Sequence, residues 1–318
     1  MAGVMVALLF SPPVTVAFEL TLYALMLGSA QLRARLWAAA RQPLPAMALA
    51  FWLLMALAML YSIAPWREAF GVWWSWRRLV LLALAAFAAA LMLREPALSP
   101  AGRVLLILIA LLLCSNVILV TTARSGYAAL IVLTVILAYQ WPRSASHLQR
   151  LAWTAAGAAA IAGALALSPI VQQRVAKGLH ELAHYDRNPG LSPIGDRVIF
   201  LRNSLELATE RPLFGYGTGA FREAYAKKVG REALQTKDPH NAYLFVAVQY
   251  GLAGLAVFLA LLAVALRQPA RAPFRLLALS ALAAWCVTSL FNGHFYTFAE
   301  GRFIWLWLGA CLAREAPA

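Results

Sequence analysis

The chain has 318 residues, of which 63% are hydrophobic and only 13% are charged. A soluble domain is about half apolar and about a quarter charged, so this composition excludes an ordinary soluble protein and indicates a polytopic membrane protein. The formal charge of +14 is spread over many short segments, which argues against nucleic-acid binding and favours membrane orientation and anionic ligands.

Apolar segments long enough to cross a membrane recur along the chain. A transmembrane helix needs about 20 mostly apolar residues. Segments of this kind lie near residues 14–30, 43–62, 76–92, 103–121, 125–140, 151–169, 242–265, 273–291 and 298–313. Residues 1–11 form a further, shortened candidate. The pattern predicts an all-α polytopic membrane protein with about nine or ten transmembrane helices.

One long polar segment, residues 170–241, interrupts the apolar runs. It holds eleven of the 27 Lys and Arg residues and eight of the 13 Asp and Glu residues. We therefore expect three parts, namely an N-terminal helix bundle (1–169), a loop domain with short helices (170–241) and C-terminal transmembrane helices (242–318).

The arginines of the short loops predict the orientation. One set of alternate loops carries eleven basic residues and the opposite set carries five, so the first set is expected in the cytoplasm and residues 170–241 outside. The abundance of Ala, Leu and Arg suggests a bacterial inner membrane, with the loop domain in the periplasm. The cytoplasmic set is Arg33, Arg35, Arg41, Arg94, Arg103, Arg143, Arg150, Arg267, Arg271, Arg275 and Arg314, and the opposite set is Arg67, Arg77, Arg78, Arg124 and Arg302.

Three of the outer arginines lie in or beside apolar runs, where an unpaired charge is costly. Arg77 and Arg78 follow tryptophans in "WWSWRRLV", and we interpret them as side chains that reach the membrane interface. Arg124 stands at a predicted helix start in "TTARSGYAAL", and there we favour a functional role.

The stretch "LHELAHY" contains His180, Glu181 and His184, which match the H-E-x-x-H helix of zinc proteases. A catalytic zinc needs three protein ligands, and no clear third ligand follows in the loop. The alternative is a chance match on an interfacial helix. We favour that alternative and expect neither a metal nor another cofactor.

A helix and a glycine-rich turn follow in "SPIGDRVIFLRNSLELATERPLFGYGTGAF". We expect Asp196 to cap the helix, Arg197 to lie in its first turn and Pro212 to end it. The glycines that follow, among them Gly215 and Gly217, form either a simple tight turn or a set of backbone N–H groups that bind an anion. Both interpretations stay open at this point.

His240 and Asn241 stand directly before the apolar run that begins at residue 242, in "KDPHNAYLFVAVQYGLAGL". Both side chains are costly to desolvate, so their place at the entrance of a membrane helix needs a reason. A second histidine, His294, lies in the last outer loop, "FNGHFYTFAEGRF", where it either assists a site or is one of several interfacial polar residues.

Three motifs in this order resemble the O-antigen ligase and O-antigen polymerase family of bacterial envelope enzymes. They are Arg124 before a small residue and a span, Arg197 in a helix that ends in "PLFGYG", and His240 with Asn241 before a span that carries Gly251 and Gly254. The resemblance covers roughly residues 60–315. The chain is shorter than expected for the family, and it lacks a tryptophan often found after the arginine that corresponds to Arg197.

The resemblance implies an inverting, metal-independent glycosyltransferase whose donor is a glycan on undecaprenyl diphosphate. In the ligases the acceptor is a sugar hydroxyl of the lipid A core. It implies that His240 is the general base, because imidazole is suited to that task near neutral pH, and that Arg124 and Arg197 bind the diphosphate. Secondary candidates are Asn241, Arg202, Gly215, Gly217, His294, Arg77 and Arg78.

Other functions remain as alternatives. The single compact outer loop favours the ligase branch over an O-antigen polymerase or a protein O-oligosaccharyltransferase of the same family. A lipid transporter would need polar residues in the middle of several spans, and the predicted spans are nearly free of them. A membrane zinc protease, built on the "HELAH" stretch, is the weakest of these alternatives.

Overall fold

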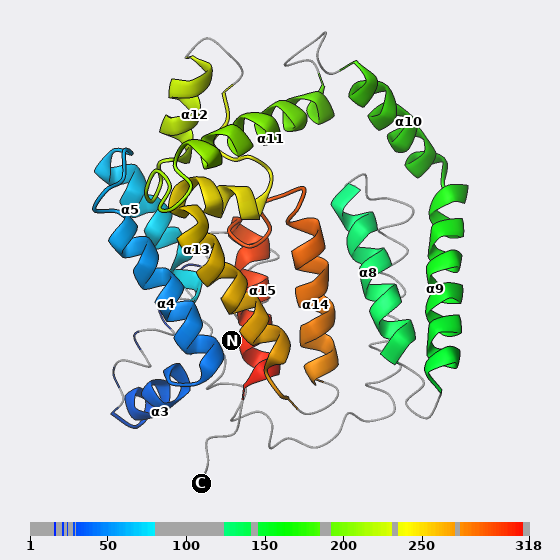
Figure 1. Ribbon diagram of the computed structural model, residues 1–318. Helices are drawn as coiled ribbons and strands as arrows, with labels where there is room; N and C mark the ends of the chain where they lie inside the picture. The colour runs from blue at the N-terminus through cyan, green and yellow to red at the C-terminus, as the bar shows by residue number, and fades with distance from the viewer. Residues whose placement is uncertain are drawn as a thin grey trace.

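The computed structural model describes residues 16, 21, 24, 28, 30–79, 124–140, 146–184, 192–230, 235–270 and 274–313. Within these ranges every regular element is a helix, which confirms the predicted all-α class (Figure 1). The first helices are α3 (Ala30–Ala40), α4 (Pro43–Ala58), α5 (Trp66–Ser75), the 3-10 helix η1 (Trp76–Leu79), α8 (Arg124–Gln140) and α9 (His147–Leu167). The later helices are α10 (Pro169–Ala183), α11 (Pro193–Glu210), α12 (Phe221–Val229), α13 (Ala242–Arg267), α14 (Phe274–Thr288) and α15 (Phe298–Leu312).

Each predicted apolar segment that falls within the described ranges is helical. The segments at 43–62, 125–140, 151–169, 242–265, 273–291 and 298–313 correspond to α4, α8, α9, α13, α14 and α15. By length and composition, α9 and α13 could cross a membrane, and α4 and α14 are shorter apolar helices. The segments at 1–11 and 103–121, and most of those at 14–30 and 76–92, lie outside the described residues. The number of spans and the side on which residues 170–241 lie stay predictions.

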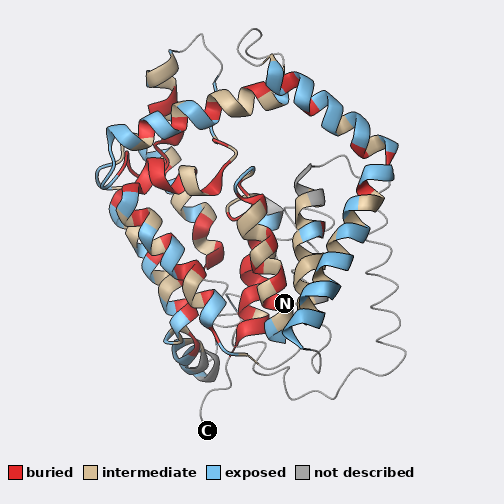
Figure 2. Cartoon of the chain, turned by 45° about the vertical axis from the view of Figure 1, so that its right-hand side comes forward, coloured by how far each residue is buried: buried red, intermediate tan, exposed pale blue. Residues whose placement is uncertain are grey.

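An aromatic core joins α4, η1, α13 and α15. The ring of Phe51 in α4 contacts Trp76 at a centroid distance of 5.5 Å and Phe258 of α13 at 5.3 Å. Phe295, just before α15, packs edge-on against Phe258 at 5.4 Å. Such edge-to-face pairs are favourable beyond their burial, so α13 is held from both sides. Figure 2 shows buried and exposed residues mixed along this group of helices, whereas α9 and α10 are largely exposed.

The helices of the loop domain, α10, α11 and α12, lie at one end of the bundle (Figure 1). The start of α11 differs from the prediction. Ser192 is the N-cap, since its hydroxyl accepts a hydrogen bond from the Gly195 N–H at 3.0 Å, and Pro193 occupies the first helical position. A serine cap followed by proline is a strong start signal, so the helix begins earlier and Asp196 lies inside its first turn. Arg197 therefore comes just after the first turn.

The helix α13 is broken at Gly251, which has a φ of 62° and a ψ of −161°. In a regular helix the N–H groups of Leu252 and Ala253 would bond to the carbonyls of Val248 and Gln249. Here all four groups bond to the turn that follows α11, which contains the "PLFGYG" motif. Figure 1 shows the resulting bend between the first turns of α13 and the rest of the helix.

The exchange of hydrogen bonds at this break is reciprocal. Leu252 N donates to Pro212 O at 2.7 Å, and Ala253 N donates to Leu213 O at 3.2 Å. In return, Tyr216 N of the turn donates to Val248 O at 3.0 Å, and Gly217 N donates to Gln249 O at 2.8 Å. The turn after α11 and the segment around Gly251 carry the two glycine motifs of the sequence, and these four backbone hydrogen bonds hold them together. We call this contact the joint, and it attaches the loop domain to α13.

Candidate active site

His240 lies in the connection between α12 and α13, at the end of a short segment that begins at Gln235. Its φ is 52°, and it is the one residue other than glycine with a positive φ in the part of the chain that the structure describes. This conformation is costly for such a residue and is frequent at functional sites. The imidazole stacks on the ring of Phe200 in α11, with 6.1 Å between centroids.

A carboxylate and a phenol hold this backbone in place. The His240 N–H donates to Asp238 Oδ1 at 2.7 Å, and the Tyr296 hydroxyl donates to the same oxygen at 2.5 Å. Tyr296 also stacks on Phe245 with a centroid distance of 4.2 Å. Burial raises the pKa of Tyr296 well above its ordinary value, and the Asp238 carboxylate adds to this effect, so the phenol remains a donor. We call these two residues, Asp238 and Tyr296, the clamp.

Asn241 has a structural place beside the histidine. Its Oδ1 accepts a hydrogen bond from Leu244 N at 3.0 Å and caps α13, and its Nδ2 donates to Leu290 O at 3.1 Å. Ala242 N donates to Ser289 O at 2.9 Å in the same connection. These bonds join the entrance of α13 to the end of α14, so His240 stands on a rigid support.

Arg197 lies on α11, one helical turn before the residue that stacks on the histidine. Arg197 precedes Phe200 by three residues, and residues three apart are neighbours on a helix surface. Because Phe200 stacks on His240, this helical turn lies next to the imidazole. Arg124 is the first residue of α8, which packs against α9 and α14. The side chain of Arg124 lies outside the described residues, so its predicted part in the site stays a prediction.

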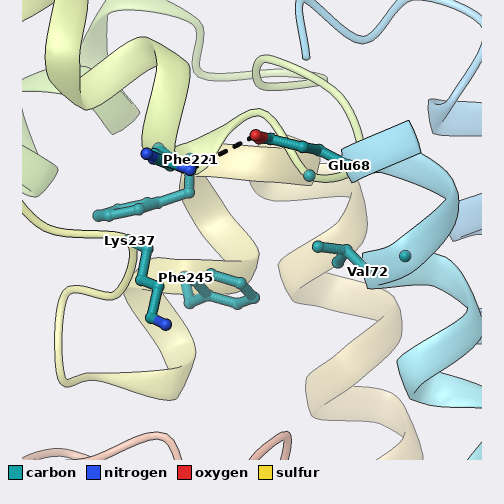
Figure 3. Close-up of a pocket in the computed structure, with 8 residues that line it drawn as sticks. Glu68, Val72, Phe221, Lys237 and Phe245 are labelled. Carbon is teal, nitrogen blue, oxygen red and sulfur yellow. Dashed lines mark hydrogen bonds and ion pairs between the residues drawn. The ribbon is translucent and has the colours of Figure 1, made fainter. Parts of the chain in front are cut away.

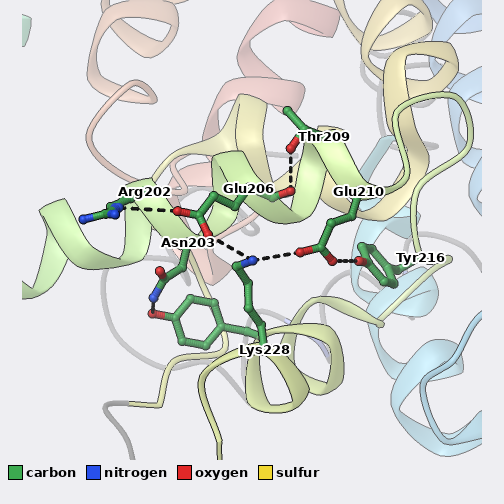
Figure 4. A network of polar contacts seen from close by, with 8 residues as sticks. Arg202, Asn203, Glu206, Thr209, Glu210, Tyr216 and Lys228 are labelled. Atoms are coloured by element: carbon green, nitrogen blue, oxygen red, sulfur yellow. Dashed lines mark hydrogen bonds and ion pairs between the residues drawn. The ribbon is translucent and has the colours of Figure 1, made fainter.

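Arg202 belongs to a different group of charges, shown in Figure 4. Its side chain is 76% exposed and pairs with Glu206 at 3.4 Å. Lys228 of α12 contacts Glu206 at 3.0 Å and Glu210 at 2.8 Å, and it lowers the pKa of both carboxyls. The Tyr216 hydroxyl donates to Glu210 at 2.5 Å. The group therefore links α11 to α12, and Arg202 points away from the helical face that meets His240.

The glycine-rich turn has its N–H groups in use. Gly215 N donates to Arg211 O at 3.1 Å, Gly217 N donates to Gln249 O at 2.8 Å, and Gly219 N donates to the Gln249 side chain at 2.6 Å. A Cβ on Gly217 would lie 2.2 Å from the Ser62 Cα. Of the two interpretations left open by the sequence, the packing turn fits this geometry, because these donors already have protein acceptors.

The two arginines of "WWSWRRLV" differ from each other. Arg77 agrees with an interfacial position, since its guanidinium lies 5.0 Å from the Trp74 ring centroid and donates to Trp74 O at 2.9 Å. Arg78 departs from the prediction, because it is only 4% exposed. It donates to the carbonyls of Ser75, at 2.5 Å, and of Thr297. The hydrogen bond to Thr297 joins η1 to the start of α15.

His294 lies in the connection between α14 and α15, beside Trp285, with 6.2 Å between ring centroids. Burial lowers the pKa of His294, and the Glu300 carboxylate opposes this effect. Its Nε2 is buried and has no hydrogen-bond partner among the described residues. This favours a neutral imidazole close to the clamp residue Tyr296 in sequence, and its assisting role stays a prediction.

The "HELAH" residues lie on α10 and its C-cap. The rings of His180 and His184 stack at 4.6 Å, and His184 Nδ1 donates to the His180 carbonyl at 2.9 Å. Glu181 is buried and accepts a hydrogen bond from Ile194 N at 3.3 Å, so it faces α11. Within the described ranges, no group of three or more His, Cys, Asp or Glu side chains is arranged to hold a metal ion.

A cavity of about 340 Å³ adjoins the clamp (Figure 3). Its lining combines aromatic and charged side chains from α5, α12, α13 and the segment before His240. Arg222 and Glu68 pair across it at 3.5 Å. Lys237 of the lining directly precedes the clamp residue Asp238, and Phe245 of the lining stacks on the clamp residue Tyr296. The lining side chains are Glu68, Val72, Phe221, Arg222, Lys237 and Phe245.

Sequence reasoning missed the clamp and the cavity. Asp238 could have been found from the sequence, because an Asp side chain often accepts a hydrogen bond from the backbone N–H two residues further on, here that of His240. Tyr296 carried none, since 58 residues separate it from Asp238. The cavity brings together residues from distant helices in the same way, and it cannot be read from spacing along one segment.

In the described residues these observations define a class of protein, namely an all-helical one with apolar helices long enough to cross a membrane and polar side chains at the start of one of them. A comparison with family models gives the particular family. The O-antigen ligase model matches residues 109–259, a stretch that contains Arg124, Arg197 and His240. The match confirms the resemblance predicted from the three motifs. A search of curated proteins gave no match.

Proposed function

We propose that the protein is an O-antigen ligase of the bacterial inner membrane. It transfers a glycan from undecaprenyl diphosphate to a sugar hydroxyl of the lipid A core, on the periplasmic side, without a metal or another cofactor. The family is one of ligase- and polymerase-like membrane glycosyltransferases, and the specific donor, acceptor and side of the membrane are parts of this proposal. The observation that supports it best is the fixed, strained backbone of His240 next to the helix that carries Arg197.

The proposed reaction uses His240 as general base. One ring nitrogen takes the proton of the acceptor hydroxyl, and the oxygen attacks the anomeric carbon of the donor sugar as the bond to the diphosphate breaks. The diphosphate leaves with the bonding electron pair, and attack from the opposite face inverts the anomeric centre. Arg124 and Arg197 stabilise the charge of the leaving group through bidentate hydrogen bonds.

The cavity beside Asp238 gives the substrate sugar a place close to the base. Its aromatic side chains, Phe221 and Phe245, offer apolar surface, and Lys237 with the Glu68–Arg222 pair offers hydrogen bonds. Ligand sites commonly combine a mainly apolar lining with a few polar groups in this way. We propose that a sugar unit next to the reacting bond occupies it.

One assay tests this function against the alternatives in the family. Purified protein in detergent is given the lipid-linked donor with one of three acceptors, namely lipid A core, a second donor molecule or an acceptor protein. A ligase gives product on a gel only with the lipid A core. Elongated donor would indicate a polymerase, and glycosylated protein would indicate an O-oligosaccharyltransferase. Failure with all three acceptors would remove the proposal.

The proposed role of Arg124 and Arg197 can be tested with substitutions that keep the positive charge of the side chain and change its shape. We expect Arg197→Lys and Arg124→Lys each to lower transfer by about 10–100-fold, because lysine cannot replace the planar, bidentate guanidinium on a diphosphate. Arg202→Lys, on the far side of α11, is the matched control and should transfer at the wild-type rate. Full activity in both variants would reduce the two residues to anchors at the membrane interface.

The clamp gives a prediction for positioning residues. We expect Tyr296→Phe to lower kcat by about 10–100-fold with little change in the donor KM, since His240 loses its fixed geometry while the arginines remain. Tyr61→Phe is the control, because it also removes one phenol hydrogen bond, to Phe214 O at 2.8 Å, away from the clamp. Equal rates for the two variants, measured at matched protein levels, would contradict a role for the clamp.

A further inference from the structure

The helix α10 carries an apolar face that the rest of the described protein leaves uncovered. Val175, Leu179 and Leu182 are 53%, 63% and 47% exposed. Their spacing of four and three residues places them on one side of the helix. This side adjoins the one that meets the protein, where Val171, Gly178 and the Glu181 side chain are buried.

The remaining side of α10 is polar. Gln173, Lys177 and His180 are exposed and follow each other at spacings of four and three, and the half-buried His184 continues the row. Lys177 lies 3.8 Å from the Glu181 carboxylate at the edge of the buried side. The helix therefore has three distinct sides, which face the protein, an apolar medium and water.

The position of α10 along the chain identifies the apolar medium. It follows α9 directly, with Ser168 as the C-cap of one helix and the N-cap of the next, and Pro169 at its first position. α9 has 21 residues, is apolar, and has a single buried residue, Leu165. At 1.5 Å per residue it spans about 30 Å, the thickness of a bilayer core, so α10 begins where the membrane surface lies. Figure 1 shows α10 leaning away from the line of α9 and meeting α11.

We propose that α10 lies in the membrane interface, with Val175, Leu179 and Leu182 among the lipid acyl chains. Lys177 then stands at the level of the phospholipid headgroups, as is typical of amphipathic helices on anionic leaflets. The arrangement also accounts for the "HELAH" pattern, because His180 and His184 share the polar side for the same reason of periodicity. It sets the height of the loop domain, since Glu181 joins α10 to the start of α11.

The experiment uses the full-length protein in vesicles of phosphatidylethanolamine and phosphatidylglycerol. The three cysteines, at positions 114, 286 and 311, are replaced by alanine, and one cysteine with an environment-sensitive fluorophore is placed at Leu179 or, as the matched control, at Gln173. Nitroxide lipids labelled near the top of the acyl chain should quench the Leu179 probe several-fold more strongly than the Gln173 probe. The emission of the Leu179 probe should also shift to shorter wavelength.

Three results would overturn the proposal. Equal quenching at both positions would mean an immersed helix, no quenching at either would mean a helix in water, and a blue-shifted but unquenched Leu179 probe would mean a protein cover. If the cysteine-free protein does not fold, hydroxyl-radical footprinting of the wild type in nanodiscs answers the same question. We then expect His180 to be oxidised several-fold more than Leu179 and Leu182, allowing for their intrinsic reactivities, and equal protection of all three would count against the proposal. None of these readouts requires glycan transfer, so they test the position of α10 independently of the proposed function.

Discussion

Replacement of His240 by alanine is expected to lower glycan transfer by about 10²–10⁴-fold, the usual contribution of a general base. The protein should still insert and bind donor, because the arginines and the clamp remain. The measurement uses purified donor and acceptor lipids in detergent, with product quantified on a gel at matched protein levels. The variant loses the one group near Arg197 that we expect to take a proton from the acceptor, so kcat should carry most of the effect.

Two further variants separate chemistry from backbone strain at this position. His240 has a φ of 52°, and asparagine tolerates such a conformation better than most residues. His240→Asn should therefore keep the fold at least as well as alanine and still fail to transfer glycan. His240→Gln should also fail, because an amide can hold a hydrogen bond but cannot accept the proton. Wild-type turnover in any of the three variants would leave His240 with a positioning role only.

The sequence was informative where structure depends on neighbouring residues. Apolar runs of helical length located α4, α9, α13 and α14 to within a few residues, because burial in lipid or protein favours helices over such segments. The ends of elements were harder to predict. Asp196 is a good capping residue, but Ser192 followed by proline gave the earlier start, and local preference alone did not rank the two signals.

The parts that escaped prediction depend on partners far away in the chain. The break at Gly251 follows from hydrogen bonds with residues near position 213, and the apolar run around it looks like one continuous helix. The clamp joins Asp238 to Tyr296 across α13 and α14. The burial of Arg78 follows from carbonyl acceptors that include Thr297. In each case the deciding contact is tertiary, so spacing within one segment could not reveal it.

The joint between α13 and the turn after α11 leads to the second large expected effect. A Cβ on Gly251 would lie 2.3 Å from the carbonyl carbon of Leu213, which is backbone and cannot move aside alone. Its φ of 62° and ψ of −161° also fall in a region that is nearly confined to glycine. We therefore expect Gly251→Ala to destabilise the protein by at least about 3 kcal/mol.

In the Gly251→Ala variant, a change of α13 to a regular helix would also be destabilising. In that case Leu252 N and Ala253 N would return to the carbonyls of Val248 and Gln249, and the turn after α11 would lose its four backbone partners at once. The loop domain would then detach from the entrance of α13, and the clamp around His240 would lose its support. Whether α13 keeps its break with a strained alanine or becomes a regular helix, we expect a lower unfolding temperature and loss of glycan transfer.

The matched control for this prediction is Gly163→Ala in α9. A Cβ at Gly163 would meet no atom within 4 Å, and alanine favours a helix over glycine by up to about 1 kcal/mol. We expect this variant to unfold at the wild-type temperature or slightly above it. Thermal unfolding in detergent, followed by tryptophan fluorescence and size-exclusion chromatography, distinguishes the two. A Gly251→Ala protein as stable and active as Gly163→Ala would show that α13 runs unbroken and that the two glycine motifs do not form a joint.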